Sequence, residues 1–387
     1  MTPAQRRHGL AAAICCVAVF GLSVGEGVPL MSLLLDSRGT DPVLTGLNAG
    51  STFIGVIVGP LLAPRAIRLL GIRRLLGICL VLDIAAFMLM KVFDGLPAWF
   101  ALRILGGTIG SSIFTASEAW ITQLAGPASR GRVIGLYATA LSAGFGLGPL
   151  LLSWTGIDGW PPFIANALIT AAAILPLFGV GDIAQDFGRE RGGSPLAMFA
   201  RAPFLLLVVA LFGLYETALL TLLPIWGVRE GLPTGIAAAT VSVVYIGAIA
   251  LQVPVGFLSD KVSRRAALLL CVSAGLAGAA LVPFIATSTA ALFATLFIWG
   301  GTVSGIYPVA LGMAGDRFRG SEMVALNAAI VMAYGLGSLT GPTLAGAAMD
   351  AWNPQGLLGF FVVLFAGFLG VMMWNWSGLR RHASRQR

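Results

Sequence analysis

The chain has 387 residues, of which 57% are hydrophobic and only 10% are charged, and its mean hydropathy is +0.91. A soluble protein carries charge on about a quarter of its residues, so this composition excludes a soluble globular protein and requires a surface that faces lipid. Membrane β-barrels are built from short segments of alternating hydrophobicity, which this sequence lacks. Long apolar runs predict an all-α integral membrane protein, because a helix satisfies its own backbone in hydrocarbon.

Twelve apolar runs are long enough to cross a bilayer, which takes roughly 20 residues. In chain order they are 10–35, 43–64, 74–92, 97–119, 133–154, 161–181, 203–227, 234–256, 266–286, 289–313, 323–348 and 356–378. The first run is too long for the core of a cleaved signal peptide, so we interpret it as a retained helix. The longest polar stretch, 182–201, predicts a cytoplasmic linker between an N-terminal six-helix bundle (1–181) and a C-terminal one (202–387).

The formal charge of +8 is distributed by side of the membrane. When Arg6 and Arg7 are placed inside and the sides alternate at each span, only Arg38, Lys91 and Arg229 fall outside, and Arg103 falls within a span. This is the positive-inside pattern, so we expect both termini in the cytoplasm and a location in the bacterial inner membrane. The charge therefore indicates topology and contact with the lipid bilayer, and nucleic acid is not expected as a partner.

The two halves repeat each other at single-residue level. Phe20-Gly21-Leu22 matches Phe212-Gly213-Leu214, and Gly55 matches Gly247, both at an offset of 192. Further matches at offsets near 190 are Gly106-Gly107-Thr108 with Gly300-Gly301-Thr302, and Gly146-Leu147-Gly148 with Gly335-Leu336-Gly337. Parallel six-helix repeats are typical of one transporter architecture.

The motifs of both halves resemble the major facilitator superfamily over essentially the whole chain. The cassette from Gly256 to Arg265 is similar to the family's loop motif, Gly-x-Leu-Ala-Asp-Arg-x-Gly-Arg-Arg, and Arg103-Ile-Leu-Gly106-Gly107 resembles the Arg-x-x-x-Gly of its fourth helix. The run from Gly144 to Pro149 resembles the family's antiporter motif, but the terminal Gly-Gly is missing. The resemblance implies twelve helices in two pseudo-symmetric bundles around a central cavity. It also points to a compact bacterial subfamily whose substrates are mostly unassigned.

The loop motif and its degraded copy in the first half predict a gate. The gating-loop residues are Pro64, Arg68, Gly71, Arg73, Gly256, Asp260, Lys261, Arg264 and Arg265, and the expected latch partners are Glu118, Arg130, Arg132, Arg317 and Arg319. Asp260 is expected to latch the halves in an outward-open state, with Arg317 and Arg319 near it, while Arg68 would pair with Glu118. Charges that serve only to set the topology are the alternative in both halves.

Three ionisable side chains within spans stand out, because each such group costs at least ~2.5 kcal/mol near the bilayer centre. They are Glu26, Arg103 and Glu216, which we take as candidates for proton coupling or for the cavity wall. Glu26 and Arg103 lie at similar depth, so a pair between them is geometrically possible. A permanent structural pair, or a glutamate that faces water without turnover, remains the alternative. Asp83 is interpreted first as a packing hydrogen bond.

Glycines and prolines on the fifth and eleventh runs predict close helix packing. The residues are Gly144, Gly148, Pro149, Gly337, Gly341 and Pro342. Both a packing that rocks during transport and a static one fit this pattern.

These features favour a secondary active transporter that moves a small organic molecule by proton-coupled efflux. Uptake by symport of a sugar or metabolite is the alternative, and a non-transporting sensor is a weaker one. Gly21-Leu-Ser23-Val-Gly25 is a literal Gly-x-Ser-x-Gly, but it lies within an apolar run without a preceding strand, so we expect neither an enzyme nor catalytic residues. The four cysteines lack metal spacing, and no metal or cofactor is expected. Protons and a small molecule are the expected partners, and the chain is expected to be a monomer.

Overall fold

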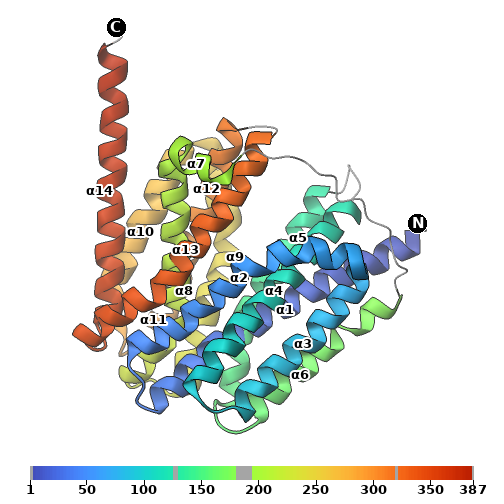
Figure 1. Cartoon of the computed structure of the whole chain (residues 1–387). Coiled ribbons are helices and arrows are strands. Elements are labelled where there is room, and N and C mark those ends of the chain that lie inside the picture. The colour runs from blue at the N-terminus through green and yellow to red at the C-terminus, as the bar shows by residue number, and fades with distance from the viewer. Residues whose placement is uncertain (1–2, 125–129, 180–193, 319–320, 386–387) are drawn as a thin grey trace.

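The computed structural model describes residues 3–124, 130–179, 194–318 and 321–385, almost all of them helical (Figure 1). The elements are α1 (Pro3–Ser37), α2 (Pro42–Leu70), α3 (Ile72–Val92), α4 (Leu96–Leu124), α5 (Arg130–Thr155), α6 (Pro161–Ala172), the 3-10 helix η1 (Leu175–Gly179), α7 (Pro195–Arg201), α8 (Pro203–Arg229), α9 (Thr234–Lys261), α10 (Arg264–Ile285), α11 (Thr289–Val303), α12 (Ile306–Arg317), α13 (Ser321–Ala351) and α14 (Gly356–Arg385).

The twelve predicted spans are confirmed. Eleven helical stretches in the described part of the chain are long and apolar enough to cross a membrane, and α4, which carries Arg103 and Glu118, completes the set. Two spans are broken. The sixth changes from α6 to η1 just before Pro176, and the tenth divides into α11 and α12 shortly before Pro308, because proline has no amide proton and its ring crowds the preceding turn.

The predicted linker is only partly described, since 180–193 lies outside the described residues. Its end, 194–201, contains α7, a short helix that the sequence did not predict. Met198 on α7 is buried, and α7 packs against α13. The predicted boundaries of the two bundles, at residues 181 and 202, stay a prediction.

The helices form two bundles, one from α1–α6 and one from α8–α14 (Figure 1). Matching glycines of the repeat set matching helix crossings. A methyl group at Gly55 would collide with the backbone of Ile104, and one at Gly107 with that of Thr52, so these glycines let α2 lie against α4. In the second bundle α9 approaches α11 in the same way at Gly247 and Gly301. The duplication seen in the sequence is therefore also a duplication of contacts.

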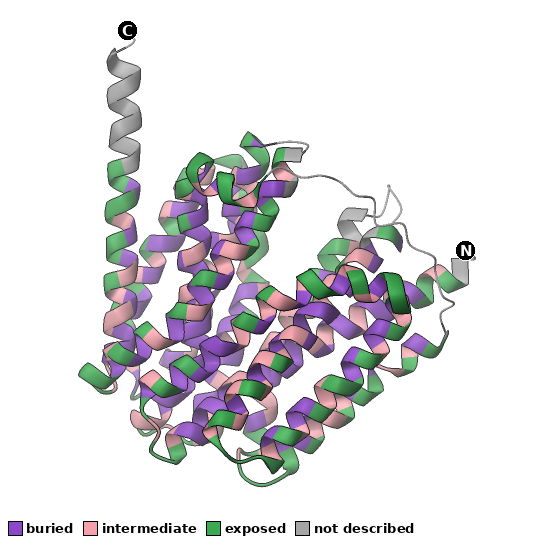
Figure 2. Cartoon of the chain, in the orientation of Figure 1, coloured by how far each residue is buried: buried purple, intermediate pink, exposed green. Residues whose placement is uncertain are grey.

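The outer surface is apolar, as a lipid-facing surface must be. Large side chains such as Leu69 and Phe284 are 83% exposed, and Trp154 is 75% exposed. Buried residues follow the helix faces that pack against other helices, while exposed ones line the outer faces (Figure 2). An exposed apolar surface of this extent marks contact with lipid rather than water.

The two bundles share a core at only one end of the molecule. We call the end with the α1–α2 connection (Ser37–Pro42) the short-loop end, and the end with α7 and the cassette 256–265 the basic end. Buried side chains near the short-loop end of the first bundle, such as Leu34 and Trp99, belong to the same apolar cluster as the core of the second bundle. At the basic end the first bundle has a separate core that includes Ile72 and Ile121. The helices accordingly diverge toward the basic end (Figure 1).

Candidate functional site

Glu216 lies between the two bundles near mid-depth, about 20 Å from the end of α8 at 1.5 Å per residue. Two tyrosine hydroxyls donate hydrogen bonds to its carboxylate. Tyr334 on α13 reaches Oε2 at 2.7 Å, and Tyr245 on α9 reaches Oε1 at 3.2 Å. Each carboxylate oxygen therefore has its own donor, and the side chain is held in one orientation.

The same tyrosines contact aromatic rings of the first bundle. Tyr245 stacks on Phe145 of α5 with ring centroids 5.4 Å apart, and Tyr334 meets Phe53 of α2 edge-on at 6.3 Å. Phe145 and Tyr334 differ by 189 residues, and Phe53 and Tyr245 by 192, so the four rings are two pairs of repeat equivalents. The second half adds hydroxyl groups at both positions, and it places Glu216 where the first half has Val24.

Two more rings complete this aromatic cluster, which we define as Phe53, Phe145, Phe212, Tyr245, Tyr307 and Tyr334. Phe212 and Tyr307 contact each other and both contact Tyr334, at centroid distances between 5.7 and 6.5 Å. Four of the six side chains, together with Glu216, are only partly buried, although they lie between the bundles. A carboxylate beside a cluster of aromatic rings combines a negative charge with π faces, two features that attract a cation.

Glu26 and Arg103 are both buried but do not form the pair that their depth allowed. Glu26 is fully buried in α1, and its Oε2 accepts a hydrogen bond from Asn166 Nδ2 at 2.8 Å. Arg103 on α4 is 4% exposed, and its Nε and Nη2 have no hydrogen-bond partner within the described chain. Neither a hydrogen bond nor an ion pair joins the two described side chains. Asp83 does accept a hydrogen bond, from Ser23 at 2.8 Å, as expected of it.

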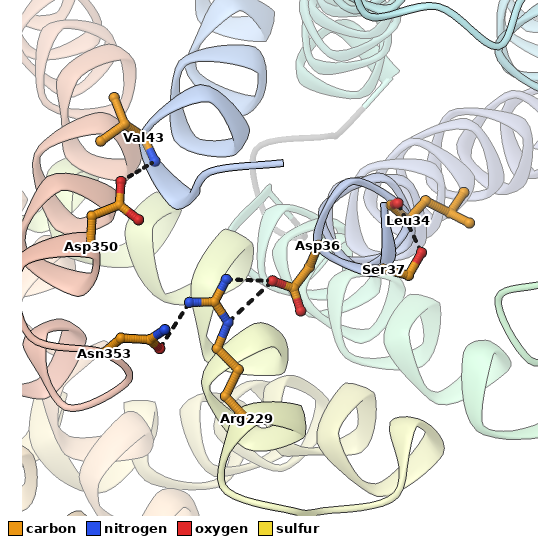
Figure 3. Close-up of polar contacts among 7 residues, drawn as sticks. All are labelled: Leu34, Asp36, Ser37, Val43, Arg229, Asp350 and Asn353. Atoms are coloured by element: carbon orange, nitrogen blue, oxygen red, sulfur yellow. Dashed lines mark hydrogen bonds and ion pairs between the residues drawn. The ribbon is translucent and has the colours of Figure 1, made fainter. Parts of the chain in front are cut away.

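At the short-loop end an ion pair bridges the bundles (Figure 3). Arg229, the last residue of α8, lies 2.6 Å from Asp36 near the end of α1, and it also donates to Asn353 at 2.8 Å. The side chains of Arg229 and Asp36 are only 22% and 13% exposed. Partial burial strengthens the attraction between the charges relative to a fully solvated pair, so this contact holds α1 against α8.

Further contacts close the same end. Asp350 on α13 accepts a hydrogen bond from the backbone N–H of Val43 on α2 (Figure 3), and Ser153 on α5 donates to the carbonyl of Gly235 on α9. The glycines Gly46 and Gly346 let α2 and α13 approach to backbone contact. Polar and backbone contacts thus join the two bundles at the short-loop end.

The second-half cassette is mostly helical rather than a loop. Gly256 to Lys261 complete α9, Arg264 and Arg265 begin α10, and only two residues lie between. Arg264 donates to Asp316 at the end of α12, at 3.3 Å, and to Ser259 at 3.2 Å. The cassette therefore does contact the tenth span, but the observed pair is Arg264–Asp316, within one bundle. The exposed Lys261 and Arg317 lie over the neighbouring rings of Phe257 and Phe318.

The first-half copy is also helical up to its glycine. Pro64 and Arg68 belong to α2, and α3 starts directly after Gly71, whose φ of +77° favours a residue without a side chain. Arg68 and Glu118 are both exposed. Their pairing stays a prediction.

Several latch residues lie outside what the structure describes. Arg319 is not among the described residues, and the side chains of Asp260, Arg130 and Arg132 are likewise not described. The latch through Asp260 stays a prediction.

The four predicted packing glycines of α5 and α13, Gly144, Gly148, Gly337 and Gly341, pack helices within each bundle, not between bundles. Gly144 and Gly148 bring α5 against α1, where a methyl group at Gly148 would collide with the backbone of Glu26. Gly337 and Gly341 bring α13 against α8 in the same way. Pro149 and Pro342 lie within these helices, and the carbonyl of Pro342 is the group that Gly46 approaches.

The sequence did not predict several residues that make the contacts described above. Tyr334, Asn166, Asp36 and Asp316 carried no motif, and Arg229 was counted only as an outer charge. The repeat could have identified Tyr334, because the offset of 189 that aligns Gly146 with Gly335 also aligns Phe145 with Tyr334. Asn166 and the Asp36–Arg229 pair join segments far apart in the chain, and no local pattern marks them.

Comparison with known proteins agrees with this architecture. The family model "Major Facilitator Superfamily" matches residues 13–245 and 234–387. The chain belongs to the major facilitator superfamily. Relatives in this superfamily include the uncharacterised transporter YfkF of Bacillus subtilis, 25% identical over 91% of both chains, and an uncharacterised transporter of Yersinia pseudotuberculosis, 27% identical over 93% of both.

Solved structures of the superfamily share the fold. A point mutant of the nucleoside transporter NupG matches with a TM-score of 0.80 at 14% identity, over 96% of this chain and 99% of the other. A bacterial homologue of the lysosomal transporter Spinster, inward-facing and unoccupied, matches with a TM-score of 0.72 at 16% identity, over 96% of both. As a member of the superfamily whose model it matches, the chain is a membrane transporter with twelve spans, not an enzyme.

Proposed function

We propose that the protein exports a small amphipathic organic cation from the cytoplasm across the inner membrane in exchange for protons. The observation that carries this proposal is Glu216, a carboxylate held by two tyrosines whose rings belong to the aromatic cluster and contact the first bundle. The carboxylate supplies one negative charge, and aromatic faces attract a cation at close range. One charge suits a monocation rather than a polycation.

Proton exchange is assigned to Glu26. It is fully buried in α1 and lies against Gly148 of α5. One turn earlier on α5, Phe145 stacks on Tyr245, which holds Glu216. A change of charge at Glu26 that shifts α5 against α1 therefore reaches the substrate carboxylate through a short chain of packed groups.

The positive-inside pattern supports placing the basic end and both termini in the cytoplasm. In that orientation the contacts around Asp36–Arg229 form the outer gate, and the conformation described is inward-facing. The gate opens when these contacts between the bundles break and the basic ends approach each other. The cassette latches, including Asp260, then act in the outward-facing state. The protein works as a monomer whose two halves move relative to each other.

Proton-coupled uptake of a sugar or metabolite remains the second candidate. The incomplete antiporter motif after Pro149 favours it, since Leu152 and Ser153 stand where that motif has its Gly-Gly. The aromatic cluster also fits a neutral ligand with a flat ring, and nucleosides therefore belong in any substrate screen.

The test is counterflow in proteoliposomes, with labelled tetraphenylphosphonium, uridine and a hexose as probes. We expect exchange of tetraphenylphosphonium in the wild type and its loss in Glu216→Gln. Exchange of uridine or the hexose without tetraphenylphosphonium would contradict the cation assignment. Unchanged exchange of the cation in Glu216→Gln would remove Glu216 from the substrate site.

A further inference from the structure

Four polar side chains from three helices form one hydrogen-bonded network inside the first bundle. Ser23 and Glu26 belong to α1, Asp83 to α3 and Asn166 to α6. Ser23 Oγ lies 2.8 Å from Asp83 Oδ2 and 3.0 Å from Asn166 Oδ1, while Asn166 Nδ2 lies 2.8 Å from Glu26 Oε2. Glu26 and Asn166 are fully buried, and Ser23 is 8% exposed. The network thus links two carboxyl groups through a hydroxyl and an amide.

The count of donors decides where a proton must be. A serine hydroxyl has one proton to donate, yet Ser23 Oγ lies within hydrogen-bond distance of two acceptor oxygens. If Asp83 carries a proton, Asp83 donates to Ser23, Ser23 donates to Asn166 Oδ1, and Asn166 Nδ2 donates to Glu26. All three contacts are then satisfied, with Glu26 ionised. If both carboxyl groups are ionised, one of the two contacts of Ser23 has no proton.

A second arrangement satisfies the same contacts in the opposite direction. When the amide of Asn166 turns over, its oxygen and nitrogen exchange places at nearly the same positions. Glu26 can then donate a proton to the amide oxygen, the amide nitrogen donates to Ser23, and Ser23 donates to an ionised Asp83. The nearby Thr170 hydroxyl, 3.4 Å from Asn166 Oδ1, can donate or accept and adapts to either arrangement. One proton therefore fits at either end.

The surroundings disfavour a network with no proton. No lysine or arginine forms a hydrogen bond or an ion pair with these four residues within the described chain, and two unpaired carboxylates inside a bundle would carry a large desolvation cost. The other titratable groups within the spans that form or pack against this part of the bundle are Cys15 and Cys16 on α1, Cys79 and Lys91 on α3, Arg103 and Glu118 on α4, Tyr137 on α5, and Tyr215 and Glu216 on α8. None of these described groups hydrogen-bonds to the network. The network's own proton is therefore its means of neutralising charge.

One atom of the network is left open. Glu26 Oε1 is buried and has no hydrogen-bond partner among the described residues. A buried acceptor without a partner costs about 1–3 kcal/mol, and a further proton bound at this atom would neutralise the charge of Glu26. Glu26 thus has one carboxylate oxygen that the network does not use, which fits the proton exchange proposed for it, while the shared proton stays within the network.

We infer that Glu26 and Asp83 are the two ends of one proton site, which retains a single proton shared through Ser23 and Asn166. The role of this proton site in transport rests on the proposed proton coupling, but the existence of the site does not. Transfer needs no other reactant: an O–H bond breaks at one carboxyl group, an O–H bond forms at the other, and the hydroxyl and amide relay between them. The two carboxyl groups then titrate as a pair rather than separately.

Replacing either carboxyl group by an amide should ionise the other one. The two single variants therefore differ in which residue is charged, but both should change the infrared spectrum in the same way. In Glu26→Gln the new amide imitates protonated Glu26 and leaves Asp83 ionised. In Asp83→Asn it imitates protonated Asp83 and leaves Glu26 ionised. Infrared spectra of the purified full-length protein near neutral pH report protonated carboxyl groups through their C=O stretch. We expect each single variant to lose the same one-carboxyl band, and the double variant to lose no more.

Three outcomes would overturn the inference. A band lost in only one single variant would assign the proton to one residue alone. Separate bands that add up in the double variant would mean two independent protons. Displacement of the band by sodium at constant pH would make the network a metal-cation site.

A further variant keeps the test valid if an amide variant folds poorly. Ser23→Ala removes the link but neither carboxyl group. In this background Asp83 stays protonated by itself, so Glu26→Gln should no longer abolish the band. Loss of the band in this background would contradict sharing through Ser23. The infrared measurement does not depend on transport. If the bands change as expected but transport is not coupled to protons, the proposed function is contradicted and the shared proton site is not.

Discussion

At the scale of single residues, Glu216 differs from the other intramembrane carboxylates in its partners. Two tyrosine hydroxyls hold it, and the same rings contact the first bundle. Neighbouring Tyr215 is buried, and its hydroxyl has no partner among the described residues. Adjacent positions on α8 thus provide a tyrosine without a hydrogen bond and a glutamate with two.

The hydroxyl of Tyr334 should matter for cation binding, while that of Tyr215 should not. A hydrogen bond to a charged group contributes about 1.5–3 kcal/mol, and about 1.4 kcal/mol corresponds to tenfold in affinity. We expect Tyr334→Phe to raise the Kd for tetraphenylphosphonium about tenfold, because Glu216 loses its shorter hydrogen bond. Tyr215→Phe is the matched control and should leave the Kd unchanged. Equal effects of the two variants in equilibrium binding would show that the Tyr334 hydroxyl does not act through Glu216.

The ion pair Asp36–Arg229 is expected to govern closure at the short-loop end. Spin labels at Asp41 and Trp352, exposed on opposite bundles, should show one short distance in the wild type. Arg229→Ala should add a population at longer distance, because the largely buried charge on Asp36 loses its partner. Exchanging the two residues, Asp36→Arg with Arg229→Asp, should restore the single distance.

A control for this gate lies at the same end. Arg38 pairs with Asp94 within the first bundle and stacks over Trp99 at 4.7 Å. Arg38→Ala should leave the distance between the bundles unchanged. A change as large as that in Arg229→Ala would mean that general loss of charge at this end, rather than the bridging pair, opens the gate.

At the scale of helices, the sequence predicted which segments span the membrane better than it predicted the residues at which those helices end. Hydropathy alone located all twelve spans, because a span must be apolar over its whole length. It placed the end of the second span near residue 64 and that of the eighth near 256, whereas α2 continues to Leu70 and α9 to Lys261. Charged residues near a membrane surface remain compatible with a helix, and hydropathy cannot distinguish such a turn from a loop. The breaks at η1 and before α12 follow from Pro176 and Pro308.

Glycine positions explain which helices lie in contact. Replacing different glycines by alanine should have opposite effects on the stability of the protein. Gly341→Ala would place a methyl group against the backbone of Leu214, and overpacking costs about 1–3 kcal/mol. Gly367→Ala on α14 meets open space and gains about 0.5–1 kcal/mol from helix propensity. We expect the midpoint temperature of thermal unfolding in detergent to be lower for Gly341→Ala than for the wild type. For Gly367→Ala it should be equal or higher. A Gly341→Ala protein as stable as wild type would contradict the close crossing of α13 and α8.

At the scale of the whole molecule, the two helix bundles are repeats of each other, but the residues of the candidate site are not repeated. The repeat in the sequence predicted two alike bundles, and the paired crossings at Gly55 with Gly107 and at Gly247 with Gly301 confirm it. The site departs from the repeat. Glu216 and the hydroxyls of Tyr245 and Tyr334 occur only in the second half, while the network of Glu26 and Asp83 occurs in the first. Sequence reasoning identified both glutamates by their cost in a membrane, but it could not assign their partners, which come from helices distant in the chain.

The division of labour between the halves has a direct consequence. If Glu216 binds the substrate and Glu26 exchanges the proton, the two functions are separable by substitution. Counterflow needs only the substrate site, since no net proton movement is required. Accumulation driven by a pH gradient needs both sites.

The most direct measurement is therefore accumulation of tetraphenylphosphonium in proteoliposomes under an imposed pH gradient, compared with counterflow in the same vesicles. We predict that the wild type accumulates the cation in the more acidic compartment and that reversing the gradient reverses the movement. Glu26→Gln should keep counterflow and lose gradient-driven accumulation. Movement of the cation together with protons, or accumulation by Glu26→Gln equal to wild type, would contradict proton exchange through Glu26.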